Sequence, residues 1–133
     1  MVNAQLNFLH ICDYASISDG GKLNILGIFE NIFAKTVLTT HPQFYIVTNI
    51  GIKQVGNYKL IIKIVRNRDG QEIITPLEFN LTIGQLPATN IANAGVIGQL
   101  NNVKFEEAGT YSVQIFIDAE KIGERSLVVT KIA

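Results

Sequence analysis

The sequence predicts an all-β fold, an antiparallel β-sandwich of about eight strands. Runs rich in β-branched and aromatic residues alternate with turn signals, and no window shows a sustained helical period or an internal repeat. The turn signals recur at short, even intervals, which is typical of a sandwich rather than of alternating strands and helices. The clearest are Asp19-Gly20-Gly21, Val55-Gly56-Asn57, Asp69-Gly70, Gly84, Gly109 and Gly123.

The first two predicted strands are strongly apolar. The first covers about 4–14 and places five side chains on one face: Leu6, Phe8, His10, Cys12 and Tyr14. The second covers 22–33 and is apolar on both faces, as expected of a central strand or of one that a partner covers. The segment 22–33 is therefore the first candidate for contact with a partner or a second protomer.

The next three strands are predicted at 43–53, 57–66 and 73–83. The strand at 43–53 follows His41-Pro42, a dipeptide biased toward extended backbone. Asp69-Gly70 favours a tight hairpin between the next two strands. Pro76 cannot donate to a β-ladder, so the strand that contains it is predicted to lie at a sheet edge or to be bulged.

The last part of the chain has one weak and two strong strand signals. Residues 85–95 are the least patterned and are predicted to form a long loop or a short helical turn. A weak strand is predicted at 96–103. Strong alternation predicts strands at about 111–117 and 125–131.

Size and charge limit the function classes. The 133 residues fit a single domain, 1–133. Eleven basic and eleven acidic residues give a formal net charge of zero. Because phosphate neutralisation drives nucleic-acid affinity, the lack of a basic excess predicts no nucleic-acid partner. A near-neutral chain that is 47% hydrophobic favours self-association instead.

The single cysteine, Cys12, allows no internal disulfide and fits a reducing compartment. The first residues lack the basic and apolar regions of a signal peptide. No apolar run approaches the roughly 20 residues that span a bilayer. We therefore expect a cytoplasmic protein with no membrane partner.

The most specific local motif lies at 100–113. Its Glu107, Gly109 and Tyr111 have the spacing of a tyrosine corner, in which the tyrosine hydroxyl bonds to nearby backbone. The segment resembles the turn into the penultimate strand of immunoglobulin-like domains. Val113 stands where antibody domains have a disulfide cysteine, which fits a reduced member of this class. The resemblance implies an immunoglobulin-like fold and no particular function.

A second set of motifs covers more of the chain. It comprises Leu9-His10-Ile11-Cys12-Asp13-Tyr14-Ala15, the segment 21–30 that begins Gly21-Lys22-Leu23, and His41-Pro42-Gln43-Phe44. The combination resembles an uncharacterised family of small bacterial proteins, a domain of unknown function. The resemblance extends to the strand that begins Gly109-Thr110-Tyr111 and to the return at 124–129. It implies no activity and no cofactor.

Four residues are weak candidates for chemistry: His10, Cys12, Asp13 and His41. His10 and Cys12 share a strand face and are two ligands, but zinc needs three or four. A Cys–His nucleophile needs an orienting third group and an oxyanion hole, and nothing marks either. Packing explains His10 and Cys12 more simply. Asp13, on the opposite face, is expected to accept backbone N–H bonds near the 16–21 turn.

Carboxylates gather in the last third of the chain. Sandwich loops can bind calcium with such groups, but these interleave with Lys104, Lys121 and Arg125 and include no Asp-x-Asp pattern. A solvated mixed-charge rim is the better interpretation. We therefore expect no metal, no cofactor and no catalytic residue. The carboxylates are Glu106, Glu107, Asp118, Glu120 and Glu124.

Three functions remain open. The first is a non-enzymatic interaction or structural module, with a protein partner or a homo-oligomer formed through an edge strand or an apolar sheet face. The second is a domain that binds a small molecule or carbohydrate. The chain has no tryptophan, and Tyr45, Tyr58 and Phe116 are candidates for stacking, although each is more simply a core or sheet-face residue. The third, a hydrolase, is the least supported.

Overall fold

The computed structural model describes residues 3–132, which form nine β-strands and, within that range, no helix. One sheet holds four strands in the order β2-β1-β4-β7, and the other holds five in the order β3-β9-β8-β5-β6. No helix in this range is long and apolar enough to cross a membrane. The strands are β1 (Ala4–Ile17), β2 (Leu23–Ile28), β3 (Asn31–Ala34), β4 (Thr39–Ile52), β5 (Gly56–Arg66), β6 (Leu77–Ile83), β7 (Ala92–Phe105), β8 (Gly109–Ile117) and β9 (Glu120–Lys131).

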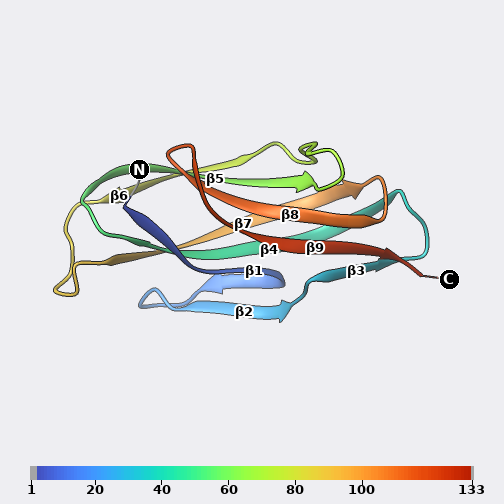
Figure 1. The fold of residues 1–133 in the computed structure, drawn as a ribbon. Helices are drawn as coiled ribbons and strands as arrows, with labels where there is room; N and C mark the ends of the chain where they lie inside the picture. Colours follow the sequence, from blue (N-terminus) through green and yellow to red (C-terminus); the bar gives the residue numbers. More distant parts are fainter. Residues whose placement is uncertain (1–2, 133) are drawn as a thin grey trace.

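The two sheets pack face to face over one main core (Figure 1). Alternate residues of the central strands point inward, as in β5, where Leu60, Ile62 and Ile64 are fully buried. Their neighbours Lys59 and Lys63 point outward and pair with Glu78 and Glu72 on the outer face. This alternation is the pattern from which the sequence predicts a sandwich, and the all-β fold of two packed sheets is confirmed.

A second, smaller cluster lies on the outer face of the four-stranded sheet. Beyond Cys12, β1 leaves β4 and pairs only with β2. The resulting hairpin bends so that Leu23 lies over Gly95 of β7, where a Cβ would come within 3.3 Å of the Leu23 side chain. The hairpin and the outer face together enclose Cys12, Ala15 and Val47 completely or nearly so.

β1 contains a bulge that the alternation pattern does not predict. The register with β4 shifts between Leu6 and Phe8. Leu6 therefore packs into the main core, whereas Phe8 and Cys12 belong to the outer cluster. The predicted common face for Leu6, Phe8, His10, Cys12 and Tyr14 is thus wrong at its first member.

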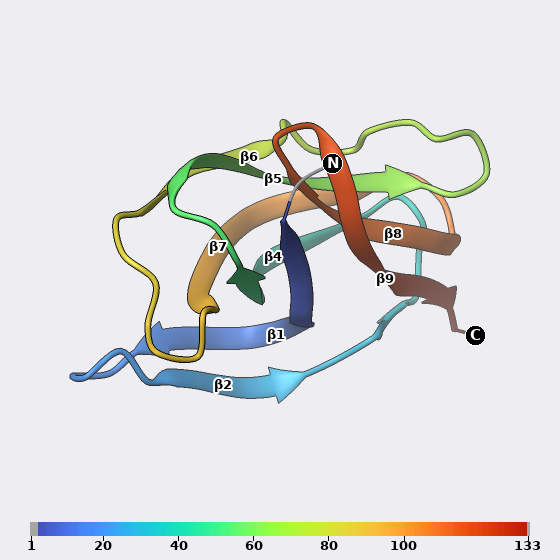
Figure 2. The same cartoon turned by 60° about the vertical axis from the view of Figure 1, so that its left-hand side comes forward.

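The segment 22–33 is not one central strand. It divides into β2, an edge of the four-stranded sheet, and β3, an edge of the five-stranded sheet. β3 pairs with β9 in parallel over four residues, whereas the other ladders are antiparallel. Figures 1 and 2 show β2 leading into β3 along one side of the molecule. Apolar residues on both faces here mark a segment that changes sheets, not a central position.

The region 85–105 is more ordered than its composition indicates. β7 begins at Ala92 and pairs with β4 over its whole length, so the predicted weak strand at 96–103 is a long edge strand. β4 itself begins at Thr39, and Pro42 lies inside it opposite Asn102, whose positive φ of 53° marks an irregularity in the facing strand. Pro76 lies just before β6, which is an edge strand as predicted.

Candidate functional site: the side formed by β2 and β3

The chain crosses from one sheet to the other at Phe29 and Glu30. The Phe29 N–H donates to the Ile11 carbonyl of the first sheet at 2.9 Å, and the Glu30 carbonyl accepts from Val128 N–H of the second sheet at 2.9 Å. The Glu30 carboxylate also pairs with Arg125 of β9. Two adjacent residues therefore bond to different sheets, which fixes the crossing point.

A pocket of about 360 Å³ lies at this crossing. Its polar groups come from three strands: Asp13 of β1, Asn31 of β3 and His41 of β4. The remaining lining is apolar and comes from Gly27, Ile28, Phe29, Ile32 and Phe33. The structure thus brings together two of the predicted site residues, Asp13 and His41, which are 28 positions apart in the sequence.

Gly27 makes room for the Asp13 carboxylate. Its φ is +69°, a left-handed conformation that favours glycine. A Cβ at this position would lie 2.5 Å from Asp13 Oδ2. In the described part of the chain no hydrogen bond reaches the Asp13 side chain, so the expected bonds to the 16–21 turn are not formed. That turn is held by its own backbone, with Ser18 N–H donating to the Lys22 carbonyl at 2.8 Å.

His41 is half-buried between aromatic rings. Its ring centroid is 5.6 Å from that of Phe29 and 5.3 Å from that of Phe44. Burial lowers the pKa of His41 below its ordinary value, and the Asp13 charge opposes this shift only in part. The imidazole is therefore neutral at physiological pH.

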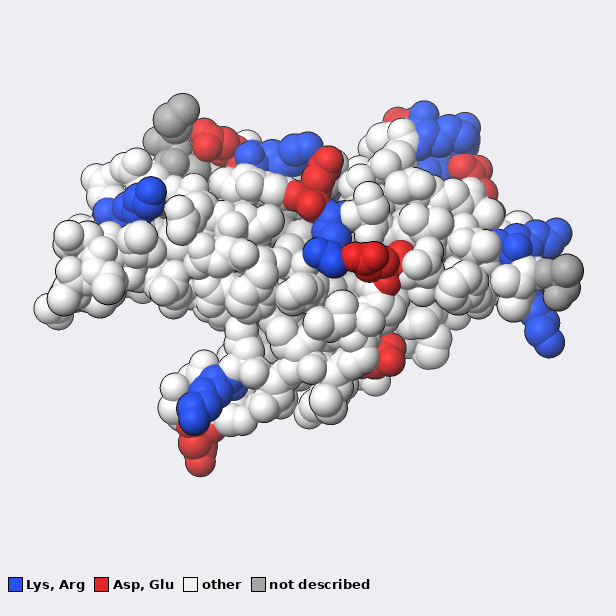
Figure 3. Space-filling model, turned by 60° about the horizontal axis from the view of Figure 1, so that its bottom comes forward, with Lys and Arg blue, Asp and Glu red and all other residues white. Residues whose placement is uncertain are grey.

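Exposed apolar side chains gather around the same crossing. Within residues 3–132, nine large hydrophobic residues are exposed, and seven of them lie in the segment from Tyr14 to Leu38. Phe33 is 64% exposed, Leu26 61% and Ile28 52%. Figure 3 shows a broad face with few charged side chains on this part of the molecule. We call the exposed set Tyr14, Leu26, Ile28 and Phe33 the β2–β3 patch.

The opposite pair of sheet edges has a different surface. The outward residues of β6 are Glu78, Asn80 and Thr82, and those of β7 include Asn93 and Gln99. Polar and charged side chains at an edge discourage pairing with another chain. β2 carries no charged residue between Leu23 and Ile28, so its free edge lacks this protection.

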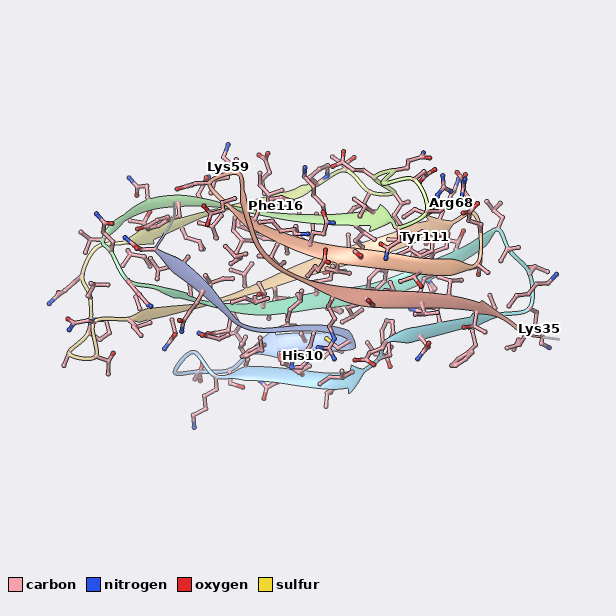
Figure 4. All side chains as sticks on the ribbon, viewed as in Figure 1. His10, Lys35, Lys59, Arg68, Tyr111 and Phe116 are labelled. Atoms are coloured by element: carbon pink, nitrogen blue, oxygen red, sulfur yellow. The ribbon has the colours of Figure 1, made fainter. Side chains whose placement is uncertain are left out.

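His10 and Cys12 do not join His41. Cys12 is fully buried in the outer cluster, its Sγ lies 3.7 Å from the Tyr45 carbonyl, and burial raises the pKa of its thiol. His10 stacks on Phe8 with ring centroids 5.4 Å apart (Figure 4), and its buried Nδ1 has no partner within residues 3–132. Over the same range no three His, Cys, Asp or Glu side chains are placed to hold a metal ion.

The predicted tyrosine corner lies at the start of β8, which β9 separates from β3 in the five-stranded sheet (Figure 4). The Tyr111 hydroxyl donates to the Glu107 carbonyl at 2.7 Å, and the ring packs edge-on against Phe105 at 5.1 Å. The Glu107 carboxylate accepts from Arg68 at 2.6 Å. Gly109 has a φ of +139°, which only glycine adopts readily. This corner is structural.

The carboxylates of the last third separate into local pairs. Glu124 pairs with Lys121 at 3.0 Å, and Asp118 accepts from the backbone N–H of Lys59 at 2.9 Å. Together with the Glu107–Arg68 pair, these contacts make a mixed-charge surface. Arg66, a nearly enclosed cation that the sequence does not single out, is held by Asp69 at 2.8 Å and Gln71 at 2.6 Å.

The three aromatic candidates for sugar stacking are dispersed. Tyr45 packs edge-on against Tyr14 on the outer face of the first sheet. Phe116 lies on the second sheet beneath Lys63, whose Nζ is 4.8 Å from the ring centroid. The Tyr58 hydroxyl donates to the Gln54 carbonyl at 2.7 Å. These rings form no common platform.

These features define an immunoglobulin-like β-sandwich. Residues 7–130 match the model of a family of unknown function, DUF6941, and the chain belongs to that family. No curated protein matches the chain.

The chain is similar to several solved structures. The alkylpurine DNA glycosylase AlkC of Pseudomonas fluorescens, bound to DNA with an abasic site analog, is 9% identical with a TM-score of 0.52, covering 97% of this chain and 31% of that chain. An immunoglobulin-like protein from Pseudomonas aeruginosa is 13% identical with a TM-score of 0.48, covering 95% of each chain. A β-glucosidase from Listeria innocua with bound glucose is 9% identical with a TM-score of 0.49, covering 100% of this chain and 16% of that chain. At these identities the similarity concerns the fold alone.

Proposed function

We propose that this protein is a non-catalytic interaction module that pairs with a second copy of itself through β2. The observation that carries the proposal is the β2–β3 patch, which concentrates exposed apolar side chains on an edge strand that lacks charged residues. Contiguous apolar surface beside an open edge is typical of interaction sites.

A second copy is the occupant that the charges of this edge favour. In an antiparallel pair centred on Leu26, Asn24 of each copy faces Ile28 of the other, and Lys22 of each copy comes near the Glu30–Arg125 ion pair of the other, just beyond the ends of β2. The positive charge of Lys22 near the Glu30 carboxylate favours this orientation, and the two Leu26 side chains meet at the centre. The strand thus carries complementary ends and an apolar middle.

A non-catalytic role is supported by the dispersal of the reactive side chains. Cys12 is enclosed, His10 stacks on Phe8, and His41 lies in a different pocket with Asp13. Nucleophilic catalysis needs a nucleophile and a base within hydrogen-bond reach of each other.

Sedimentation velocity over micromolar to millimolar concentrations tests self-association. We expect a reversible dimer for the natural chain and a monomer for Leu26→Lys, since the variant places two ammonium groups opposite each other. Val55→Lys is the matched control, because Val55 is 52% exposed but lies between β4 and β5. A natural chain that stays monomeric at millimolar concentration contradicts the proposal.

Disulfide trapping tests the register. Residues facing each other in an antiparallel pair have Cα atoms about 4.5–5.5 Å apart, within disulfide range. Leu26→Cys should therefore cross-link on mild oxidation. Asn24→Cys should not, because the two copies of residue 24 would be offset by four residues, roughly 13 Å. Equal cross-linking of both variants would refute the register.

A further inference from the structure

The pocket between the two sheets has the composition of a small binding site. Its volume of about 360 Å³ is at the lower end of ligand pockets, and it combines apolar walls with three polar side chains. Neither self-association nor the tyrosine corner accounts for this arrangement. The pocket is also placed where four segments of the chain converge, β1, β2, β3 and β4.

The pocket contains one acidic group and no basic residue. Asp13 supplies an exposed carboxylate, and no hydrogen bond or ion pair from residues 3–132 engages it. The lining includes no lysine or arginine. His41 adds no positive charge at physiological pH, because burial lowers the pKa of its imidazole. A carboxylate of this kind favours a cationic ligand group, which can donate charge-assisted hydrogen bonds.

The walls suit the apolar part of such a cation. Phe29 and Phe33 contribute aromatic rings, and Ile28 and Ile32 contribute aliphatic surface. Aromatic faces attract ammonium groups as well as alkyl chains. The Asn31 amide offers an additional acceptor beside the carboxylate.

Gly27 shows that the space around the carboxylate depends on a glycine. A side chain there would meet Asp13 Oδ2 at 2.5 Å and Asp13 Cγ at 3.0 Å. The left-handed backbone at Gly27 and the orientation of the carboxylate are therefore coupled. The close approach of Asp13 to Gly27 places the carboxylate beside the pocket.

We propose that the pocket lined by Asp13, Phe29, Asn31 and His41 binds a small organic cation, namely a primary ammonium group on an apolar chain. The Asp13 carboxylate accepts hydrogen bonds from the ammonium group, and the phenyl rings cover the chain. The pocket shares Ile28 and Phe33 with the β2–β3 patch, so cation binding and the proposed self-association use adjoining surfaces, but cation binding does not require the second copy.

The probe is n-pentylammonium chloride, followed by amide chemical shifts in two-dimensional NMR. Titrations use the natural chain and Leu26→Gln, which weakens the proposed pairing without adding charge near the pocket. Binding to both proteins supports the site whether or not the chain dimerises. We expect saturable shifts at Gly27, Phe29 and Asn31, with a dissociation constant in the millimolar range or tighter.

The controls separate charge recognition from general apolar binding. Pentan-1-ol and pentanoate should bind at least tenfold more weakly than pentylammonium, because neither pairs with a carboxylate. Asp13→Asn should weaken pentylammonium binding at least tenfold, and Asp19→Asn, in the exposed hairpin turn, should leave it unchanged. Equal binding of pentanol and pentylammonium, or no saturable shift at the pocket, would overturn the proposal.

Discussion

The Tyr111 hydroxyl is a single group whose contribution to stability can be isolated. It donates to the Glu107 carbonyl at 2.7 Å, and the residue is almost completely buried. Tyr111→Phe retains the ring against Phe105 but leaves that carbonyl without its donor. We expect a loss of about 1–2 kcal/mol in the free energy of unfolding, measured by urea denaturation with an unchanged slope.

Tyr58→Phe is the matched control for this measurement. Its hydroxyl makes the same kind of bond, to the Gln54 carbonyl at 2.7 Å, but at an exposed position. Because water can replace the lost donor there, the expected cost is below about 0.5 kcal/mol. If both variants lose the same free energy of unfolding, burial of the Tyr111 hydroxyl does not determine how much its hydrogen bond contributes to stability.

The Asp69 carboxyl makes the stability of the fold depend on pH in the acidic range. Its hydrogen bonds from the Arg66 guanidinium and from Gln71 N–H lower the pKa of its carboxyl from 3.8 to about 2. A carboxyl with a depressed folded-state pKa stabilises the fold above its unfolded value, and this contribution is lost as pH falls from about 4 through about 2.

The comparison of the natural chain with Asp69→Asn measures this effect. The melting temperature of the natural chain should exceed that of the variant at pH 6, and the difference should shrink between pH 4 and pH 2. An NMR titration of Asp69 should place its midpoint near 2. A difference in melting temperature that is constant from pH 6 to pH 2 would contradict the assignment.

At the scale of strands, the sequence predicts those features that depend on neighbouring residues better than those that depend on residues far apart in the chain. The corner at Glu107, Gly109 and Tyr111 is predictable because its atoms come from five consecutive residues. Pro76 likewise predicts an edge because a missing N–H is a property of the residue itself. The two sheets follow from the alternation of central strands such as β5.

The division of 22–33 between β2 and β3 depends on distant partners. Phe29 bonds to Ile11, and Glu30 bonds to Val128, so no pattern within the segment reveals the crossing. Gly27 is the one local signal, since a glycine within an apolar strand often marks a bulge or a close approach. The pocket could not be predicted, because its lining residues come from four segments of the chain.

The contact between β1 and β9 offers a steric test of strand packing. Gly123 of β9 lies directly under the Leu6 side chain, which occupies the position of a Cβ. Gly123→Ala should therefore destabilise the fold by about 1–3 kcal/mol, as expected of overpacking. In a double-mutant cycle with Leu6→Ala, the cost of Gly123→Ala should largely disappear. Strictly additive costs would show that Leu6 does not set the constraint.

At the scale of the whole molecule, the described residues form two apolar clusters of very different size. Twenty buried residues form the core between the sheets, whereas three form the cluster beneath the β1–β2 hairpin. Because local stability follows the amount of buried apolar contact, the hairpin should open more readily than the sandwich. Cys12 lies in the smaller cluster and is the single thiol of the chain, so its reactivity reports on this opening.

Thiol modification distinguishes local from global opening. At pH 8 Cys12 should react with a disulfide reagent about a hundredfold or more slowly than a free thiol, because it is fully buried and burial raises the pKa of its thiol. If the hairpin opens alone, the rate should rise only weakly with urea, with a slope well below that of global unfolding, since opening exposes little surface. A slope equal to the global value would show that the hairpin and the main core unfold as one unit.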